Sequence, residues 1–262
     1  MARIALTQAL RDEYGRLFAT CDIRAGVAAQ VEKLVDRISS ARPRYEEVAG
    51  EDEHPPWFVV GVLHAMECGL SFAEHLHNGD PLTARTTHVP KGRPPEGEPP
   101  FTWEESADDA LELEGWRRWT DYSVAGALYE IEAYNGFGYR LHHPQVLSPY
   151  LWSGSVHYTS GKYVSDGTWS DTAVSRQIGA AVLLRRLAER GLAAFADAGV
   201  DDIPRVRYAP RVVSNAAREL QRWLNGHPGI FVKVDGKAGK RTSDAFRVVT
   251  GHYLEGDPRE SR

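Results

Sequence analysis

Cysteine is scarce in this chain, and its scarcity excludes several classes of protein. Among 262 residues there are two cysteines, Cys21 and Cys68, which are too few for a disulfide framework. Neither has a partner at the spacing of a metal site. Cys68 follows an acidic residue, so a thiol nucleophile is one alternative, although small buried cysteines are common in protein cores.

Long hydrophobic runs and a positive net charge are absent as well. No apolar segment approaches membrane-spanning length, and the charged N-terminal stretch lacks the apolar centre of a signal peptide. We therefore expect no membrane insertion, and synthesis in the cytoplasm without a signal peptide. The net charge is −5, and no motif of a nucleic-acid reader is present. The composition predicts a globular protein that does not bind nucleic acid.

Charge and periodicity predict the domain organisation. From residue 204 onward there are 12 Lys and Arg against 6 Asp and Glu, whereas residues 1–203 have 19 against 30. This asymmetry predicts two domains, 1–203 and 204–262, joined by a linker at 196–204, where helical periodicity stops. Helical spacing of apolar residues recurs through the first domain, which predicts a mainly α fold. A short β-hairpin is expected in the aromatic, turn-rich region 148–167.

An apolar helix that starts at Trp57 is the centre of the first domain. Pro55 and Pro56 suit a helix entrance, and Gly69 suits a helix stop. Glu67 therefore ends a buried helix, where partial burial and the negative end of the helix dipole both favour its protonated form. Those properties describe a general acid. A solvated Glu on a frayed last turn is the alternative.

The polar segment after this helix contains a second carboxylate. Residues 78–81 read as a tight turn that would return Asp80 toward the end of the helix. Two carboxyls that face one cleft are the minimum equipment for glycoside hydrolysis. His64, His75 and His77 surround the acid without metal-ligand spacing, so we expect no metal there. We assign His64 and His77 to substrate contacts.

Aromatic and glycine-rich residues mark a second informative stretch. Tyr134, Asn135 and Tyr139 belong to a segment whose glycines allow close backbone approach and whose rings suit sugar faces. Glycine-rich turns also connect helices without any function. Further along, Trp152 fits an aminosugar groove if it is exposed and a core position if it is buried.

The end of the central helix resembles a motif of a known enzyme superfamily. Glu67–Phe72 is similar to the Glu-Ser-x-x-Phe region of lytic transglycosylases and goose-type lysozymes, with Cys68 where serine is usual. The resemblance implies that Glu67 is the catalytic acid. The order of Glu67, Asp80 and Thr86 also resembles phage-type lysozymes, although the intervening segment is longer here. That second resemblance implies catalytic roles for Asp80 and Thr86.

The segment 132–140 resembles another motif of the same superfamily, Ala-Tyr-Asn-Ala-Gly-x-Gly-Arg, with Gly136 where alanine is usual. The two motifs occur in the expected order. The resemblance implies that Tyr134 and Asn135 belong to a glycan-binding loop, and that residues 57 to about 187 adopt a lysozyme-like α+β fold with a small β-hairpin. The departures at Cys68 and Gly136 leave the reaction subclass open.

The C-terminal part resembles the three-helix peptidoglycan-binding domain. Residues 217–225 contain its Leu-Gln-x-x-Leu helix, and residues 235–246 contain its Asp-Gly-x-x-Gly-x-x-Thr-x-x-Ala-Phe turn and helix. Thr242 is suited to cap the second of these helices. The resemblance implies a small three-helix domain at 204–262 that binds the peptidoglycan glycan strand. Its positive charge suits a wall rich in anionic polymers.

These patterns together predict a peptidoglycan-degrading glycosidase, a muramidase of the endolysin kind. Glu67 would protonate the glycosidic oxygen, and Asp80, helped by Thr86, would activate a water on the opposite face. Glu74 and Glu132 are the next choices for the acid. A lytic transglycosylase, which needs one acid, is the first alternative, and a non-catalytic wall-binding protein is the second. No cofactor is required, and we expect action at the bacterial cell wall through a holin or specialised export.

Overall fold

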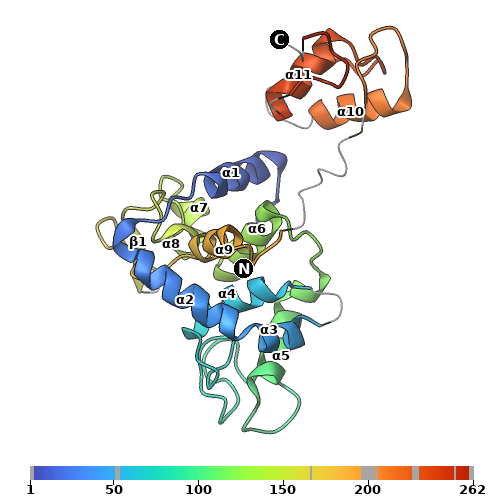
Figure 1. Cartoon of the computed structure of the whole chain (residues 1–262). Helices are drawn as coiled ribbons and strands as arrows, with labels where there is room; N and C mark the ends of the chain where they lie inside the picture. The colour runs from blue at the N-terminus through green and yellow to red at the C-terminus, as the bar shows by residue number, and fades with distance from the viewer. Residues whose placement is uncertain are drawn as a thin grey trace. The chain divides into compact units, whose positions relative to one another are not determined.

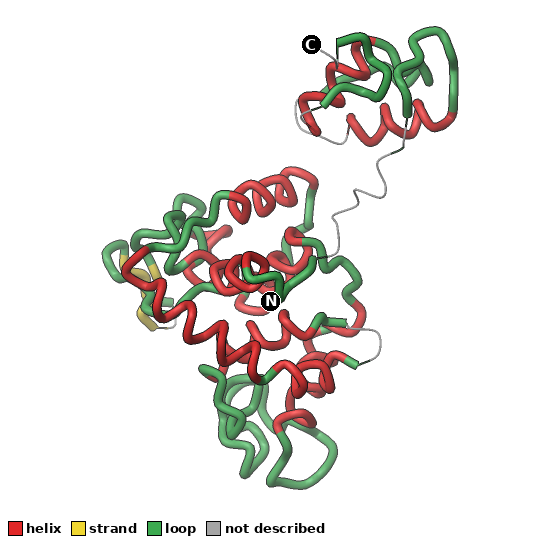
Figure 2. The backbone as a smooth tube through the Cα atoms, viewed as in Figure 1, coloured by secondary structure: helices red, strands yellow, loops and turns green. Residues whose placement is uncertain are grey.

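The computed structural model describes residues 3–50, 54–165, 167–195, 204, 206–225, 230–250 and 252–259. These residues form eleven α-helices, two short 3-10 helices and one two-stranded antiparallel sheet (Figures 1 and 2). The prediction of a mainly α fold with a small β-hairpin is confirmed. In this described part, none of the helices combines the length and the apolar character needed to span a bilayer.

Contacts divide the chain into two compact units. The first comprises Met1–Ala5 and Tyr14–Ala196, and the second comprises Leu6–Glu13 and Asp197–Arg262. Helix α1 (Gln8–Ala19) therefore contributes to both units. The predicted domain boundary at residue 203 stays a prediction, because the linker expected at 196–204 lies, apart from Pro204, outside the described residues.

The first unit contains most of the helices and the sheet. In chain order, its first elements after α1 are η1 (Ala25–Val27), α2 (Ala28–Ser40), α3 (Arg42–Ala49) and α4 (Trp57–Cys68). A long loop leads to α5 (Trp103–Glu114), η2 (Trp116–Arg118), α6 (Val124–Asn135), α7 (Gly138–His142) and α8 (Pro149–Trp152). Strands β1 (Lys162–Ser165) and β2 (Thr168–Ser170) and helix α9 (Ala180–Glu189) complete the unit.

Helix α4 forms the core of the first unit. Eleven of its 12 residues are buried, and it packs against α2, α3 and α9. Gly61 permits this close approach, because a Cβ there would lie 2.7 Å from Ile38 and 3.0 Å from Tyr45. Burying a large apolar side chain contributes about 1.5–3 kcal/mol. That gain outweighs the small loss of side-chain freedom that valines suffer in a helix.

The ends of α4 follow the sequence prediction. Pro56 occupies the N-cap position, and Gly69 closes the helix in the left-handed conformation with φ 57° and donates its N–H to the carbonyl of His64. Leu70 also has a positive φ, 65°, and its N–H donates to the same carbonyl at 3.2 Å. Two consecutive left-handed residues end the helix abruptly, so Glu67 lies in a fixed last turn rather than a frayed one.

Residues 155–158 alternate between polar and apolar side chains as a strand would, yet the hairpin expected in the region 148–167 forms later in the chain. Strand β1 pairs antiparallel with β2, and Tyr163 lies opposite Trp169. Residues 155–158 do not join this sheet, because Ser155 and Tyr158 are buried at 0% and 2% exposure and Ser155 forms an isolated bridge with Ile23. Their alternation reflects packing into the core.

The second unit has its own small apolar core. Helices α10 (Asn215–Asn225) and α11 (Lys240–Thr250) supply most of it, and the buried residues are Ala217, Leu220, Leu224, Ala238, Ala245 and Leu254. The expected cap at Thr242 is wrong, because α11 begins two residues earlier at Lys240. The Thr242 hydroxyl instead donates to the carbonyl of Lys237 at 3.2 Å.

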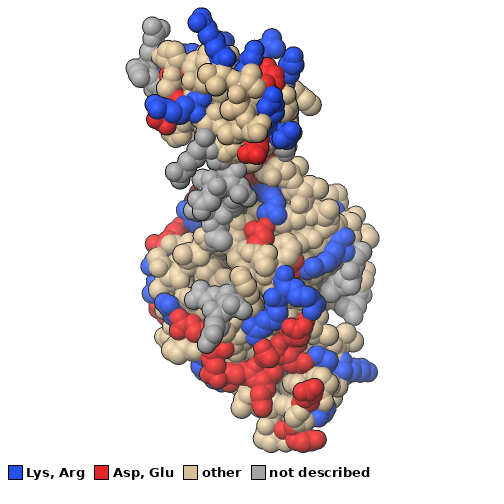
Figure 3. Space-filling view, turned by 90° about the vertical axis from the view of Figure 1, so that its right-hand side faces the viewer, with Lys and Arg blue, Asp and Glu red and all other residues tan. Residues whose placement is uncertain are grey.

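Gln221 joins α10 to the turn that precedes α11. Its side-chain oxygen accepts from the N–H of Gly236 at 2.8 Å, and its amide nitrogen donates to Asp235 at 2.9 Å. The predicted Asp-Gly turn is thus held by a buried amide. Figure 3 shows Lys and Arg side chains spread over the second unit and a gathering of Asp and Glu side chains on the first, as the uneven sequence charges predict.

Candidate active site

Glu67 occupies the last turn of α4. Its side chain is half-buried, and its Oε1 atom accepts a hydrogen bond from the hydroxyl of Tyr150 on α8. Burial raises the pKa of Glu67, and the bond from Tyr150 opposes that rise. Its Oε2 atom receives no hydrogen bond from the described residues. Glu67 is therefore a weaker acid than an exposed glutamate, which is the property that a general acid needs.

Tyr150 also lines a pocket of about 460 Å³. The other walls come from the turn between α6 and α7, from β1, and from the segment before α9. These residues are Asn135, Gly136, Gly138, Tyr139, Pro149, Lys162, Tyr163, Val164, Ser165, Ser175 and Gln177. The mixture of flat aromatic rings with amide and hydroxyl groups suits a sugar chain, whose rings have apolar faces and polar edges.

Two lining residues connect this pocket to the end of α4. The Tyr150 hydroxyl contacts the Glu67 carboxyl, and the Gln177 side-chain amide donates to the carbonyl of Met66 at 2.6 Å. Both contacts reach the last turn of the helix that carries the acid. The Glu67 carboxyl therefore lies one hydrogen bond behind the pocket wall.

An ion pair fixes the turn between α6 and α7. The Glu132 carboxylate, on α6, is 1% exposed. It accepts from the Tyr14 hydroxyl at 2.5 Å and from Nε of Arg140, on α7, at 2.9 Å. These bonds hold the two helices on either side of the pocket-lining residues Asn135 and Gly136. The order of this turn therefore comes from a buried charge pair that is satisfied on both sides.

An aromatic cluster fixes the hairpin wall. The N–H of Tyr163 donates to the Tyr139 hydroxyl at 3.4 Å. His143 stacks on Trp169 with ring centroids 3.5 Å apart, and Tyr139 and Tyr163 both meet Trp169 edge to face. Aromatic pairs in these geometries contribute about 0.5–1.5 kcal/mol each beyond burial. Strand β1 is consequently a rigid side of the pocket.

The turn that carries Asp80 returns to the end of α4, as the sequence indicated. The N–H of Asp80 donates to the side chain of Asn78 at 3.0 Å. A Cβ added at Gly79 would lie 3.5 Å from the carbonyl of Glu67, so the turn backbone packs close to the last turn of the helix. The backbone path thus follows the interpretation made from the sequence.

The carboxylate of Asp80 is engaged by its own loop. It accepts from the N–H of His88 at 2.9 Å, from Nδ1 of His88 at 2.6 Å and from the N–H of Thr87 at 2.7 Å. These bonds, those from His88 foremost, lower the pKa of Asp80. Asp80 is not among the residues that line the pocket. The structure brings the backbone of this turn close to Glu67, while the Asp80 carboxylate is bonded within its own loop.

Thr86 and His64 lie inside the protein. The Thr86 hydroxyl donates to the carbonyl of Pro90 at 2.5 Å and accepts from the N–H of Arg93 at 2.9 Å. His64 is 0% exposed, and its Nδ1 accepts from the Tyr45 hydroxyl at 3.0 Å. Burial lowers the pKa of His64 to about 4, so this ring is neutral at pH 7. The structure gives both side chains packing roles away from the pocket.

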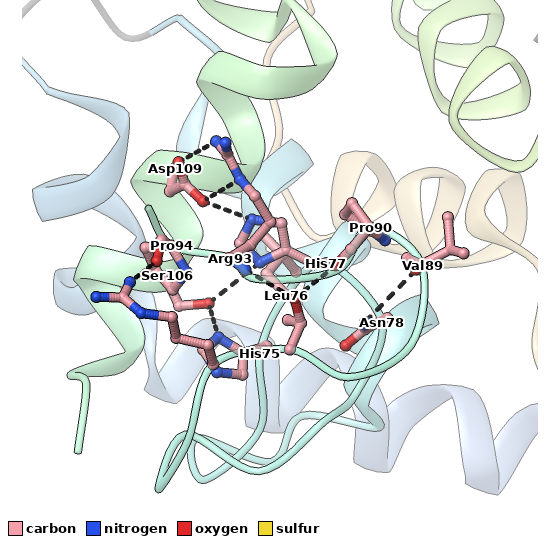
Figure 4. Close-up of polar contacts among 12 residues, drawn as sticks. His75, Leu76, His77, Asn78, Val89, Pro90, Arg93, Pro94, Ser106 and Asp109 are labelled. Carbon is pink, nitrogen blue, oxygen red and sulfur yellow. Dashed lines mark hydrogen bonds and ion pairs between the residues drawn. The ribbon is translucent and has the colours of Figure 1, made fainter. Parts of the chain in front are cut away.

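His77 belongs to a buried polar network between the long loop and α5 (Figure 4). Its Nε2 donates to Asp109 at 2.9 Å, and Arg93 donates to the same carboxylate at 2.9 Å. His75 pairs with the Ser106 hydroxyl at 2.8 Å. Burial lowers the pKa of His77. The network anchors residues 69–102, the long loop between α4 and α5 in Figure 2, and lies apart from the pocket.

The remaining predicted contacts divide between pocket and core. Asn135 and Tyr139 line the pocket. The Tyr134 hydroxyl donates to the carbonyl of Leu76 at 3.2 Å, and burial raises its pKa well above the ordinary value, so this ring supports the loop. Trp152 is 0% exposed, which matches the core alternative considered for it.

The other reactive groups near α4 do not line the pocket. Cys68 donates its thiol proton to the carbonyl of His75 at 3.2 Å, and burial raises the pKa of this thiol to about 12. Glu74 forms an isolated bridge with Pro81, and Glu132 is ion-paired. Within the described residues no group of three or more His, Cys, Asp or Glu side chains is placed to hold a metal. Glu67 does not line the pocket either, but its carboxyl is hydrogen-bonded to the lining residue Tyr150.

Tyr150, Lys162 and Gln177 are lining residues that sequence reasoning did not single out. Tyr150 lies in a run with Pro149, Leu151 and Trp152 that reads as core. Lys162 and Gln177 lie in segments without any motif. Local periodicity does not indicate that Glu67 pairs with Tyr150, because the two residues lie 83 positions apart in the chain.

Comparisons with known proteins supply no relative. A scan against family models found no match, and searches of curated proteins and of solved structures found none either.

Proposed function

We propose that this chain is a peptidoglycan-cleaving glycosidase with a lysozyme-like first domain and Glu67 as its general acid. The observation that carries the proposal is the position of the Glu67 carboxyl. It ends a buried helix, has a raised pKa, has no partner for Oε2 among the described residues, and is bonded to Tyr150, which lines the 460 Å³ pocket. A carboxyl with a raised pKa, bonded to the wall of an aromatic and polar pocket, suits the protonation of a glycosidic oxygen.

The chemistry follows from these positions. A sugar strand in the pocket would receive the proton of Glu67 on its bridging oxygen as the carbon–oxygen bond breaks. The electron pair of that bond leaves with the oxygen, and Glu67 becomes a carboxylate. Because Tyr150 donates to this carboxylate, its hydroxyl stabilises the charge that develops on the acid during the step.

The fate of the other sugar distinguishes two reaction types. A hydrolase of the inverting kind needs a second carboxylate to activate water. The described residues that line the pocket include no Asp or Glu, and the Asp80 carboxylate is bonded to Thr87 and His88. This arrangement favours our second candidate, a lytic transglycosylase, in which the substrate's own acetamido group assists and a hydroxyl of the same sugar replaces water.

The second unit supports action on the wall. Residues from 204 onward carry 12 Lys and Arg against 6 Asp and Glu, and a buried Gln221 shapes the Asp235–Gly236 turn on which the resemblance to peptidoglycan-binding domains depends. A basic module of this kind would hold the catalytic unit on an insoluble anionic polymer.

Product analysis tests the proposal. Purified cell wall is incubated with the full chain, and the soluble fragments are identified by mass spectrometry. New reducing ends indicate a hydrolase, and anhydro ends indicate a transglycosylase. Wall that binds the protein without releasing fragments would overturn the enzymatic proposal and leave the non-catalytic alternative.

A further inference from the structure

We infer that the pocket selects a glycan that bears carboxylates, and that Lys162 is the side chain that recognises them. This inference rests on the proposed function and names the substrate class of the same site. It distinguishes the carboxylate-bearing strand of the bacterial wall from a neutral strand of N-acetylated aminosugars.

The first argument is the charge of the pocket. Among its described lining residues, Lys162 is the one ionisable group that is charged at neutral pH, and no Asp or Glu accompanies it. The other polar groups are tyrosine, serine, asparagine and glutamine side chains. These neutral groups can bind hydroxyl and acetamido substituents, whereas the charge of the ammonium adds a preference for an anion.

The surroundings of the Lys162 ammonium also favour an anionic ligand. No hydrogen bond or ion pair joins its ammonium to the described residues, although its side chain is half-buried. A partly desolvated cation without a counter-charge is costly, and a ligand carboxylate in the pocket would offset that cost. Elsewhere in the unit, cations such as Arg93 and Arg140 are paired with the carboxylates of Asp109 and Glu132.

The third argument is that the backbone of Lys162 is held in place. It lies opposite Ser170 in the hairpin, and its neighbour Tyr163 is fastened to Tyr139. Lys162 and Tyr150 line the same pocket, so a carboxylate bound by the lysine would position the strand relative to Glu67. Fixed positioning of this kind turns a binding contact into selectivity for the reacting bond.

The wall glycan offers such carboxylates at regular intervals. Every second aminosugar carries a lactyl ether, whose carboxyl is either free or extended by a short peptide that has carboxylates of its own. A chitin-type strand has the same acetamido groups and no lactyl ether. A hydrogen bond to a charged group corresponds to about a 10- to 100-fold difference in binding or rate.

The experiment compares three soluble substrates of equal sugar number: wall strands with peptides, wall strands from which the peptides have been removed, and chitooligosaccharides. The full-length protein and its Lys162→Gln, Lys162→Arg and Lys33→Gln variants are assayed for kcat/KM. Lys33 is an exposed lysine on α2 that does not line the pocket, so its variant makes the same charge change away from the pocket.

We expect Lys162→Gln to lower turnover of carboxylate-bearing strands about 10- to 100-fold and to leave chitooligosaccharide turnover within about twofold. Lys162→Arg should restore much of the loss, and Lys33→Gln should change neither. A loss confined to peptide-bearing strands assigns the contact to the peptide, and a loss on both wall strands assigns it to the lactyl carboxylate. Equal losses on all three substrates, or none, would overturn the inference.

A binding measurement distinguishes a failure of this inference from a failure of the proposed function. The Glu67→Gln variant, alone and combined with Lys162→Gln, is titrated with the same three substrates in a calorimeter. If the protein proves inactive on every substrate, the proposed function fails, yet a selective loss of affinity for the two wall strands in the double variant still supports the role of Lys162. Unchanged affinity would contradict it.

Discussion

Tyr150→Phe removes one hydroxyl from the candidate site and probes the acid directly. In the structure this hydroxyl donates to Oε1 of Glu67. The bond stabilises the carboxylate and lowers the pKa of Glu67, in opposition to burial, which raises it. Without the hydroxyl, burial acts alone. The pKa of Glu67 should therefore rise further in the variant.

The size of the effect follows from the geometry. A hydrogen bond to a charged group contributes about 1.5–3 kcal/mol, and Glu67 is half-buried, so the lower end of that range applies. Because about 1.4 kcal/mol corresponds to a factor of ten in an acid dissociation constant, Glu67 should become about tenfold weaker as an acid. Phenylalanine retains the ring, so the pocket wall keeps its shape.

The assay is the pH dependence of kcat/KM on soluble wall fragments. Activity falls at high pH as the general acid loses its proton, and in Tyr150→Phe this limb should move to higher pH. Tyr163→Phe is the matched control, since Tyr163 lines the same pocket and makes no hydrogen bond to Glu67 in the described structure. A limb that stays in place, or moves to lower pH, would refute the assignment of Glu67 and Tyr150 as an acid and its partner.

Three further variants test other parts of the account. The pKa of Glu67 is higher in the folded protein than in the unfolded chain. The free energy of unfolding therefore falls as pH rises through the range between these two pKa values. Glu67→Gln should therefore gain more thermal stability over wild type at pH 8 than at pH 4, by calorimetry. Asp80, with its lowered pKa, stabilises the loop above about pH 4 and loses that effect as pH falls. Asp80→Asn should speed amide exchange in residues 73–102 at pH 7 while retaining cleavage, and a loss of activity as severe as that of Glu67→Gln would give Asp80 a role in the chemistry. Gln221→Ala leaves Gly236 and Asp235 without a buried partner, so it should destabilise the second unit by about 1–3 kcal/mol and weaken attachment to insoluble wall, with turnover of soluble fragments unchanged.

Local chemistry made helix α4 predictable. The prolines, the apolar run and Gly69 each act within a few residues, and the structure places the helix at Trp57–Cys68 with Gly69 as its left-handed cap. A capping box of Thr102 and Glu105 likewise opens α5, through residues three positions apart. The half-buried Glu67 at the helix end followed from the same reasoning, since one turn of sequence determines where an apolar helix stops.

Side-chain direction beyond the helix was less predictable. The turn at 78–81 forms, yet the carboxylate of Asp80 is bonded within its own loop, where the N–H groups of Thr87 and His88 donate to it. Trp152 is fully buried because α8 packs against α6 and α9. Such choices depend on tertiary neighbours that sequence spacing does not encode.

The wall residues of the pocket came from distant parts of the chain. One cavity is lined by the turn at Asn135 and Gly136, the strand with Lys162 and the segment with Gln177. The resemblance to glycan-binding motifs predicted only the turn at Asn135 and Gly136. Tyr150 lies in an apolar run and was not predicted as a site residue. A tyrosine that bonds a buried acid has the same sequence context as one that fills a core.

The most direct test of the central claim is the fragment yield from purified wall with Glu67→Gln and the wild-type chain at equal concentration. Glutamine keeps the shape of the side chain and an oxygen for the Tyr150 hydroxyl, but it has no proton to give. The account predicts a yield lower by about 10²- to 10⁴-fold, with attachment to the wall unchanged. A Glu67→Gln variant that releases the same fragments at a near wild-type rate would contradict it.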